Sequence, residues 1–304
     1  MQRIWGLLRD RNFVFLAALV GGLAAGHGAV YTQPLVVPAL AVVMTLATLS
    51  ISGQVFRYPR VLIRPALTGL AMSYLLQGGL ILLLAWWLVD EPAYFQGLVV
   101  LAAVPPAVVV MPLAVVLDGD PDYSLVALSG AYLGGLVLIP LIFLAFFGGE
   151  HLFRHELFLI VLLLIVAPMA ISRLILWRGW QEPILRWRGG LTNWGFFLAL
   201  YTIVGLNRQV FLDQPLALLH LIFLAVASSL LLGEVVLWLA RRRGIRLRRA
   251  KALMMIASMK NYGLASGLCL ALFGSAAAVP TTVATIVFVP YLMWLSWRLR
   301  VRKA

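Results

Sequence analysis

The chain has 304 residues, of which 63% are hydrophobic and only 12% are charged, about half the charged fraction of a soluble domain. A soluble protein with a mean hydropathy of +0.99 could not bury its apolar surface, because its exterior must be substantially polar. This composition excludes a cytosolic enzyme, a nucleic-acid-binding domain and a disordered chain, and it indicates a polytopic membrane protein.

Apolar segments long enough to cross a membrane follow one another along the whole chain. A hydrocarbon core about 30 Å thick takes about 20 apolar residues of helix. This length predicts an all-α fold with ten transmembrane helices. The predicted spans are 13–30, 34–52, 65–89, 95–117, 123–147, 157–177, 191–207, 215–240, 252–273 and 279–297. Because similar spans follow the first one, we interpret it as a membrane helix and not as a cleaved signal peptide.

The net charge of +13 agrees with this topology. With the N-terminus in the cytoplasm, 21 of the 24 Lys and Arg residues fall on the cytoplasmic side and two on the opposite side, and Lys260 lies inside a span. Cytoplasmic loops of multi-pass proteins carry an excess of Lys and Arg. We therefore expect an inner membrane protein of bacteria with both termini in the cytoplasm. Its expected partner is the lipid bilayer and not nucleic acid, and the sequence indicates no protein partner.

The ten spans divide into two sets of five, residues 1–150 and 151–304. An odd number of spans in each set forces the two sets into opposite orientations, which is the inverted-repeat design of many secondary transporters. The sequence therefore predicts two five-helix repeats that are related by an axis in the membrane plane.

The fourth span of the first repeat carries Pro105, Pro106 and Pro112. A regular helix cannot hold these three prolines, because each lacks a backbone donor and clashes with the preceding turn. Its counterpart in the second repeat is rich in glycine around Asn261. In hydrocarbon, the carbonyls that a break frees must find partners in neighbouring protein or in a water-filled cavity. These two spans are therefore predicted to be broken helices beside a polar cavity.

Several polar residues lie inside the predicted spans. A charge near the bilayer centre costs at least about 2.5–3.5 kcal/mol, so Lys260, beside Asn261, is a candidate functional residue. Glu234 lies near the cytoplasmic end of its span and could reach the interface or Arg241. Gln77 lies in the middle of the third span, where a buried amide needs partners, and we expect it to line the cavity.

Three stretches of the chain resemble the bile acid:sodium symporter family. Met259–Ala265, which reads Met-Lys-Asn-Tyr-Gly-Leu-Ala, is similar to the family's ninth-span pattern Met-Gln-Asn-Ser-Gly-Leu-Ala. Pro105–Asp120 is similar to the family's fourth-span segment, and Met44–Pro65 to its second span and basic loop. The resemblance implies a panel domain and a core domain, with fourth and ninth helices that break and cross in the core. It also implies that sodium and substrate bind at the crossing.

The sequence departs from the family where sodium would bind. The family's Thr-Ala-Ser-Asn in the fourth-span break is replaced here by the apolar residues 108–111, its ninth-span glutamate by Ile256, and its glutamine by Lys260. We therefore predict a secondary transporter of a small or amphipathic organic anion that is not coupled to sodium, with Lys260 in place of the cation. The lysine could load and release a proton, or it could stay charged in an uncoupled carrier or exchanger.

The candidate substrate- and ion-binding residues lie at the two breaks or in the third span. They are Lys260, Asn261, Gln77, Pro105, Pro106, Met111, Pro112 and Ser258. The sequence predicts no cofactor and no metal site, and it lacks the HExxH, GxSxG and P-loop patterns that would indicate an enzyme. Three alternatives stay open: a sodium-coupled symporter of organic anions, a non-transporting membrane scaffold or sensor with the same fold, and an ion channel.

Overall fold

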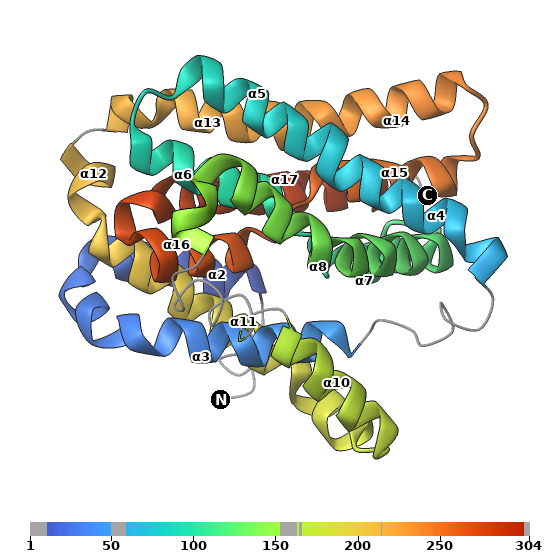
Figure 1. Cartoon of the computed structure of the whole chain (residues 1–304), viewed down its shortest axis with the longest axis horizontal. Coiled ribbons are helices and arrows are strands. Elements are labelled where there is room, and N and C mark those ends of the chain that lie inside the picture. The colour runs from blue at the N-terminus through green and yellow to red at the C-terminus, as the bar shows by residue number, and fades with distance from the viewer. Residues whose placement is uncertain (1–10, 50–58, 153–162, 164–165, 214, 301–304) are drawn as a thin grey trace.

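The computed structural model describes residues 11–49, 59–152, 163, 166–213 and 215–300, and the regular secondary structure in these ranges is helical (Figure 1). Six helices among them are long and apolar enough to cross a membrane, so the chain is a multi-pass membrane protein. They are Gly26–Thr48, Leu62–Leu88, Pro121–Gly148, Gln181–Leu206, Leu219–Arg242 and Ser275–Leu295.

Each of the six long helices covers most of one predicted span, and Gly26–Thr48 also includes the end of the predicted span 13–30. The other four predicted spans contain shorter apolar helices, at Phe13–Ala24, Pro92–Ala103, Ala167–Trp177 and Tyr262–Phe273. Part of the predicted span 157–177 lies outside the described residues.

A first group of helices, the α3/α11 group, lies along one side of the molecule (Figure 1). It contains α2 (Arg11–Ala24), η1 (Gly26–Gly28), α3 (Ala29–Thr48), α10 (Ala167–Trp177) and α11 (Gln181–Leu206). α11 packs along both α2 and α3, and α10 packs on α3. The Thr32 and Thr202 hydroxyls are hydrogen-bonded at 2.6 Å, and Arg173 donates to the Thr48 carbonyl at 2.6 Å. These bonds join helices that are far apart in the sequence.

The second group, the α6/α16 group, contains most of the buried apolar side chains. Its first part is α4 (Pro59–Leu70), η3 (Ala71–Gly78), α5 (Gly79–Leu88), α6 (Pro92–Ala103), α7 (Val110–Val116) and α8 (Pro121–Leu152). Its second part is α13 (Leu219–Val226), η6 (Ala227–Leu231), α14 (Leu232–Arg242), α15 (Leu247–Ser258), α16 (Tyr262–Phe273) and α17 (Ser275–Arg300). The short α12 (Arg208–Asp213) and η5 (Pro215–Leu218) precede α13.

Two of the long helices change from α to π geometry in the middle. η3 joins α4 to α5, and η6 joins α13 to α14, so each π segment lies within one long apolar helix. Single π turns inside α-helices often mark functional sites. The two segments contact each other, because Gln77 Nε2 in η3 donates to the Ser228 carbonyl in η6 at 3.1 Å.

A turn after α7 lies against the start of α15. Lys251 Nζ donates to the Leu117 carbonyl at 2.7 Å, and Arg248 Nε donates to the Gly119 carbonyl at 3.1 Å. Two basic side chains of α15 therefore bind carbonyls at the end of α7 and in the turn after it, where the helix dipole favours cations.

Glu234 in α14 pairs with Arg298, with Oε1 and Nη1 2.5 Å apart. The sequence suggested Arg241 as a partner of Glu234. Arg241 instead donates to the Ile245 carbonyl, four residues further along the chain, at 3.3 Å. The partner on α17 could not be inferred from the sequence, because it depends on how α14 and α17 are placed.

Candidate functional site

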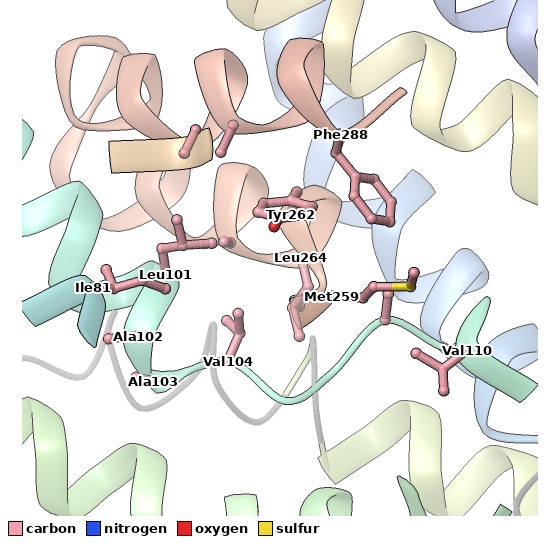
Figure 2. Close-up of a cluster of buried hydrophobic side chains, with 14 of the residues drawn as sticks. Ile81, Leu101, Ala102, Ala103, Val104, Val110, Met259, Tyr262, Leu264 and Phe288 are labelled. Carbon is pink, nitrogen blue, oxygen red and sulfur yellow. The ribbon is translucent and has the colours of Figure 1, made fainter. Parts of the chain in front are cut away.

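The helix that begins with α6 is interrupted after Ala103. Pro105 and Pro106 supply no backbone N–H, so the last carbonyls of α6 lose the donors that would continue the helix. The chain then runs in an extended form and becomes helical again at Val110. Figure 2 shows this extended segment running between Val104 and Val110, past Met259 and Leu264.

A second interruption, between α15 and α16, lies against the first. Asn261 donates its backbone N–H to the Pro105 carbonyl at 3.0 Å, and Ala107 donates to the Met259 carbonyl at 2.8 Å. These bonds form an antiparallel bridge between Pro106 and Lys260. Each break therefore supplies backbone partners to the other, which a buried break requires.

Lys260 is fully buried at this bridge. Its Nζ donates to the Ala102 and Val104 carbonyls, each at 2.8 Å, and to Ser73 Oγ at 3.1 Å. The ring centroid of Tyr74 lies 4.8 Å from the same nitrogen, which adds a cation–π contact. The amine therefore has three hydrogen-bond partners. It lies at the carbonyl end of α6, where the helix dipole favours a cation.

Asn261 is the N-cap of α16. Its Oδ1 accepts from the Leu264 backbone N–H at 3.1 Å, the usual bond of an asparagine cap. Its Nδ2 donates to the Tyr132 hydroxyl at 3.2 Å and to Met44 Sδ at 3.4 Å. The side chain therefore holds α16, α8 and α3 together at the bridge.

Gln77 and Ser258 lie apart from the cavity described next. Gln77 is fully buried between η3 and η6, and its Oε1 has no hydrogen-bond partner among the described residues. Ser258 is the last residue of α15 and donates to the Met254 carbonyl at 2.7 Å. The structure thus brings neither side chain to the cavity wall.

A cavity of about 540 Å³ lies between the two helix groups. On the side of the α6/α16 group it is lined by the first break (Ala107, Val108, Val109, Met111), the second break (Lys260, Asn261, Tyr262, Gly263), Ser266, Thr285 and Phe288. On the side of the α3/α11 group it is lined by Phe15 of α2, by Val43, Met44, Ala47 and Leu49 in and after α3, and by α11. Its size is within the range of small-molecule sites.

The wall formed by α11 presents one face of that helix. Arg188, Thr192, Phe196 and Ala199 line the cavity at the spacing of residues that share a helix face. Arg188 is half-buried and makes no hydrogen bond or ion pair with the described part of the chain. Arg188 was not among the predicted site residues, because the predicted span 191–207 left it in a cytoplasmic loop, whereas α11 begins at Gln181.

Pro105 and Pro106 shape the site through the backbone and are not among the residues that line the cavity. Pro105 and Pro106 are buried in the backbone bridge, and Pro112 lies in the first turn of α7. Met111 faces the cavity. Among the described residues, no three His, Cys, Asp or Glu side chains lie close enough together to hold a metal ion.

No protein-family model matches this chain, and no curated protein matches it.

Proposed function

We propose that this chain is a secondary transporter of a small or amphipathic organic anion in the inner membrane of bacteria. The observation that carries the proposal is the cavity between the two helix groups, at the place where two broken helices meet. The described residues that line it include Lys260 and Arg188 and no Asp or Glu. Broken helices at the substrate site, facing a cavity, are typical of secondary transporters.

We further propose that the chain crosses the membrane ten times as two inverted five-helix repeats. Each repeat has a π segment in its third span, η3 and η6, and a break in its fourth, after α6 and after α15. The bridge between the breaks is antiparallel, as inverted segments would be. In this proposal the α3/α11 group is the panel domain and the α6/α16 group is the core domain of a fold resembling the bile acid:sodium symporters.

The proposed cytoplasmic side is supported by contacts between loops. The Arg248 and Lys251 side chains bind carbonyls of the turn after α7, and Arg173 binds the carbonyl of Thr48 at the end of α3. Each contact joins two segments that the ten-span topology places on the same side. An odd number of spans between the two segments of a contact would place them on opposite sides.

Lys260 takes the place of a coupling cation in the proposed mechanism. Its Nζ already has three hydrogen-bond partners at the carbonyl end of α6, so a sodium ion at this position would face a full positive charge. The Ala102 and Val104 carbonyls can only accept, whereas the Ser73 hydroxyl can accept from the amine or donate to it, so the three contacts fit both protonation states. The position at the carbonyl end of α6 supports the charged form, because the helix dipole favours a cation there. We propose a carrier or exchanger of anions in which this charge stays fixed.

The test is uptake of labelled organic anions into proteoliposomes under separately imposed sodium and proton gradients. We expect uptake that neither gradient stimulates and that unlabelled anion inside the vesicles accelerates, because exchange is the signature of a carrier. Stimulation by sodium would contradict the proposed coupling. Stimulation by protons that is lost in Lys260→Gln would assign the proton to this lysine instead.

Two alternatives have specific support. The Oε1 of Gln77, which has no hydrogen-bond partner in the described part of the chain, favours a sodium-coupled symporter. Stabilisation of the purified protein by NaCl but not by KCl would identify it. The apolar residues Val108 and Val109 at the break favour a scaffold or sensor that does not transport. Anion binding without accelerated exchange would identify that protein.

A further inference from the structure

Two basic residues line the cavity, and their charges lie in different places. The Nζ of Lys260 is bonded to the Ala102 and Val104 carbonyls and to Ser73, none of which lines the cavity. Arg188 is half-buried on the α11 wall, and its guanidinium makes no hydrogen bond or ion pair with described residues. The charge available to a ligand in the cavity is therefore that of Arg188.

The surroundings of Arg188 are polar on one side. Thr192 lies one helical turn further along α11 and also lines the cavity, as does Asn193. The remaining wall is largely apolar and includes Val108, Met111 and Phe288. A ligand that matches this lining has one anionic end and an apolar body.

We propose that Arg188 binds the head group of an amphipathic monocarboxylate, whose apolar body lies against the first break and α17. A guanidinium presents paired donors that match the two oxygens of a carboxylate. One such group, with no second free cation among the described lining residues, favours a monoanion over a dianion. The head group would then be held by the α3/α11 group and the body by the α6/α16 group, so the ligand would connect the two groups.

The general excess of arginine on the cytoplasmic side explains why a basic residue lies at this end of α11. This excess does not explain why Arg188 lies on the face of α11 that borders the cavity. Arg186, two residues away on the same helix, is exposed and does not line the cavity. Arg178 lies over the rings of Trp177 and Trp180, at 5.2 and 5.7 Å from their centroids. Because Arg186 has the same charge as Arg188 but does not line the cavity, Arg186→Gln is the matched control for Arg188→Gln.

The inference rests on the proposed function only for the assumption that the cavity binds an organic anion, and binding is measured separately from transport. The purified full chain in lipid nanodiscs is titrated with labelled 2-naphthoate, and with 2-naphthamide as a neutral probe of the same shape. The variants are Arg188→Gln, Arg188→Lys and Arg186→Gln. The probes also partition into lipid, so empty nanodiscs provide the background.

We expect naphthoate to bind the wild-type protein more tightly than naphthamide does. Arg188→Gln should weaken naphthoate binding about tenfold or more, the usual effect of losing a hydrogen bond to a charged group. Arg188→Gln should leave naphthamide binding unchanged, and Arg186→Gln should change neither. Arg188→Lys should recover part of the affinity, because it restores the charge without the paired donors.

Equal naphthoate affinity in Arg188→Gln and Arg186→Gln would overturn the inference, and so would the absence of naphthoate binding above the empty-nanodisc background. Naphthoate binding that depends on Arg188, in a protein that catalyses no anion exchange in proteoliposomes, would support the inference while contradicting the proposed function. The two proposals can therefore fail independently.

Discussion

The bridge between the two helix breaks and the α11 wall border the same cavity, and each contributes one basic side chain. At the bridge, Lys260 is fully buried and its Nζ has three hydrogen-bond partners. On the α11 wall, Arg188 is half-buried and makes no hydrogen bond or ion pair with described residues. The depth of a charge in a membrane helix therefore does not identify the group that a ligand meets. The bonds that the charge already makes identify it better.

The largest effect that separates the two regions should come from Lys260→Met. This substitution keeps most of the side-chain volume and removes the donors, so the Ala102 and Val104 carbonyls lose their partner in the interior. Leaving buried polar groups without partners costs about 1–3 kcal/mol each. We expect a destabilisation of about 3 kcal/mol or more, measured as thermal unfolding of the purified protein in detergent. Lys260→Gln, which keeps an amide donor, should lie between the variant and the wild type.

A Lys260→Met protein as stable as the wild type would show that the two carbonyls do not depend on the ammonium. The interpretation of Lys260 as a structural residue, in contrast to a ligand-binding Arg188, would then be wrong.

The next largest effect should come from Asn261→Ala at the same bridge. The substitution removes the cap on the Leu264 backbone N–H and the bond to the Tyr132 hydroxyl. Loss of an N-cap costs about 0.5–2 kcal/mol, and a further buried hydrogen bond about 1 kcal/mol. We expect a total of about 2 kcal/mol in the same unfolding experiment.

Tyr132→Phe provides the control for Asn261→Ala, because it removes the hydroxyl and leaves the cap in place. We expect it to lose about half as much stability. If Tyr132→Phe costs as much as Asn261→Ala, the cap contributes nothing and the asparagine acts only through Tyr132.

The parts of this site that follow from local chemistry could be predicted from the sequence. Pro105 and Pro106 have no N–H, so a break after α6 was predictable wherever that helix lies in the fold. Apolar length similarly predicts the long helices, because the hydrocarbon thickness sets it. The number of membrane crossings and the repeat symmetry stay predictions.

The parts that depend on tertiary placement could not be predicted. The direction of the Lys260 side chain depends on where α6 ends and where η3 lies, and neither is encoded near residue 260. Gln77 was expected at the cavity and lies instead between the π segments, whose apolar composition does not distinguish them from α-helix. Arg188 was assigned to a loop because hydropathy does not detect the polar first turns of α11.

A smaller effect is expected for Gln77→Leu, which tests the contact between the π segments η3 and η6. Only its Nε2 is bonded, to the Ser228 carbonyl, and its Oε1 has no partner among the described residues. Replacing an incompletely bonded amide by an apolar group of similar size removes one bond and one unsatisfied acceptor. We therefore expect a change below about 1 kcal/mol, measured in sodium-free buffer and again with NaCl.

A larger loss of stability in Gln77→Leu, seen only with NaCl, would mean that Oε1 binds a cation in the wild-type protein. That result would favour the sodium-coupled alternative, and it would show that the protein has a second charge site beside Lys260.

The smallest effect on stability should come from Arg188→Gln, although we expect this variant to lose the most anion affinity. No described residue depends on its guanidinium for a hydrogen bond or an ion pair, so the unfolding midpoint should match that of Arg186→Gln, within about 0.5 kcal/mol in stability. Adding 2-naphthoate should raise the midpoint of the wild type and of Arg186→Gln but not of Arg188→Gln, because only bound ligand stabilises the folded state. A clear destabilisation of ligand-free Arg188→Gln would show that the arginine is part of the fold, as Lys260 is. The difference between the two charges would then be one of burial alone.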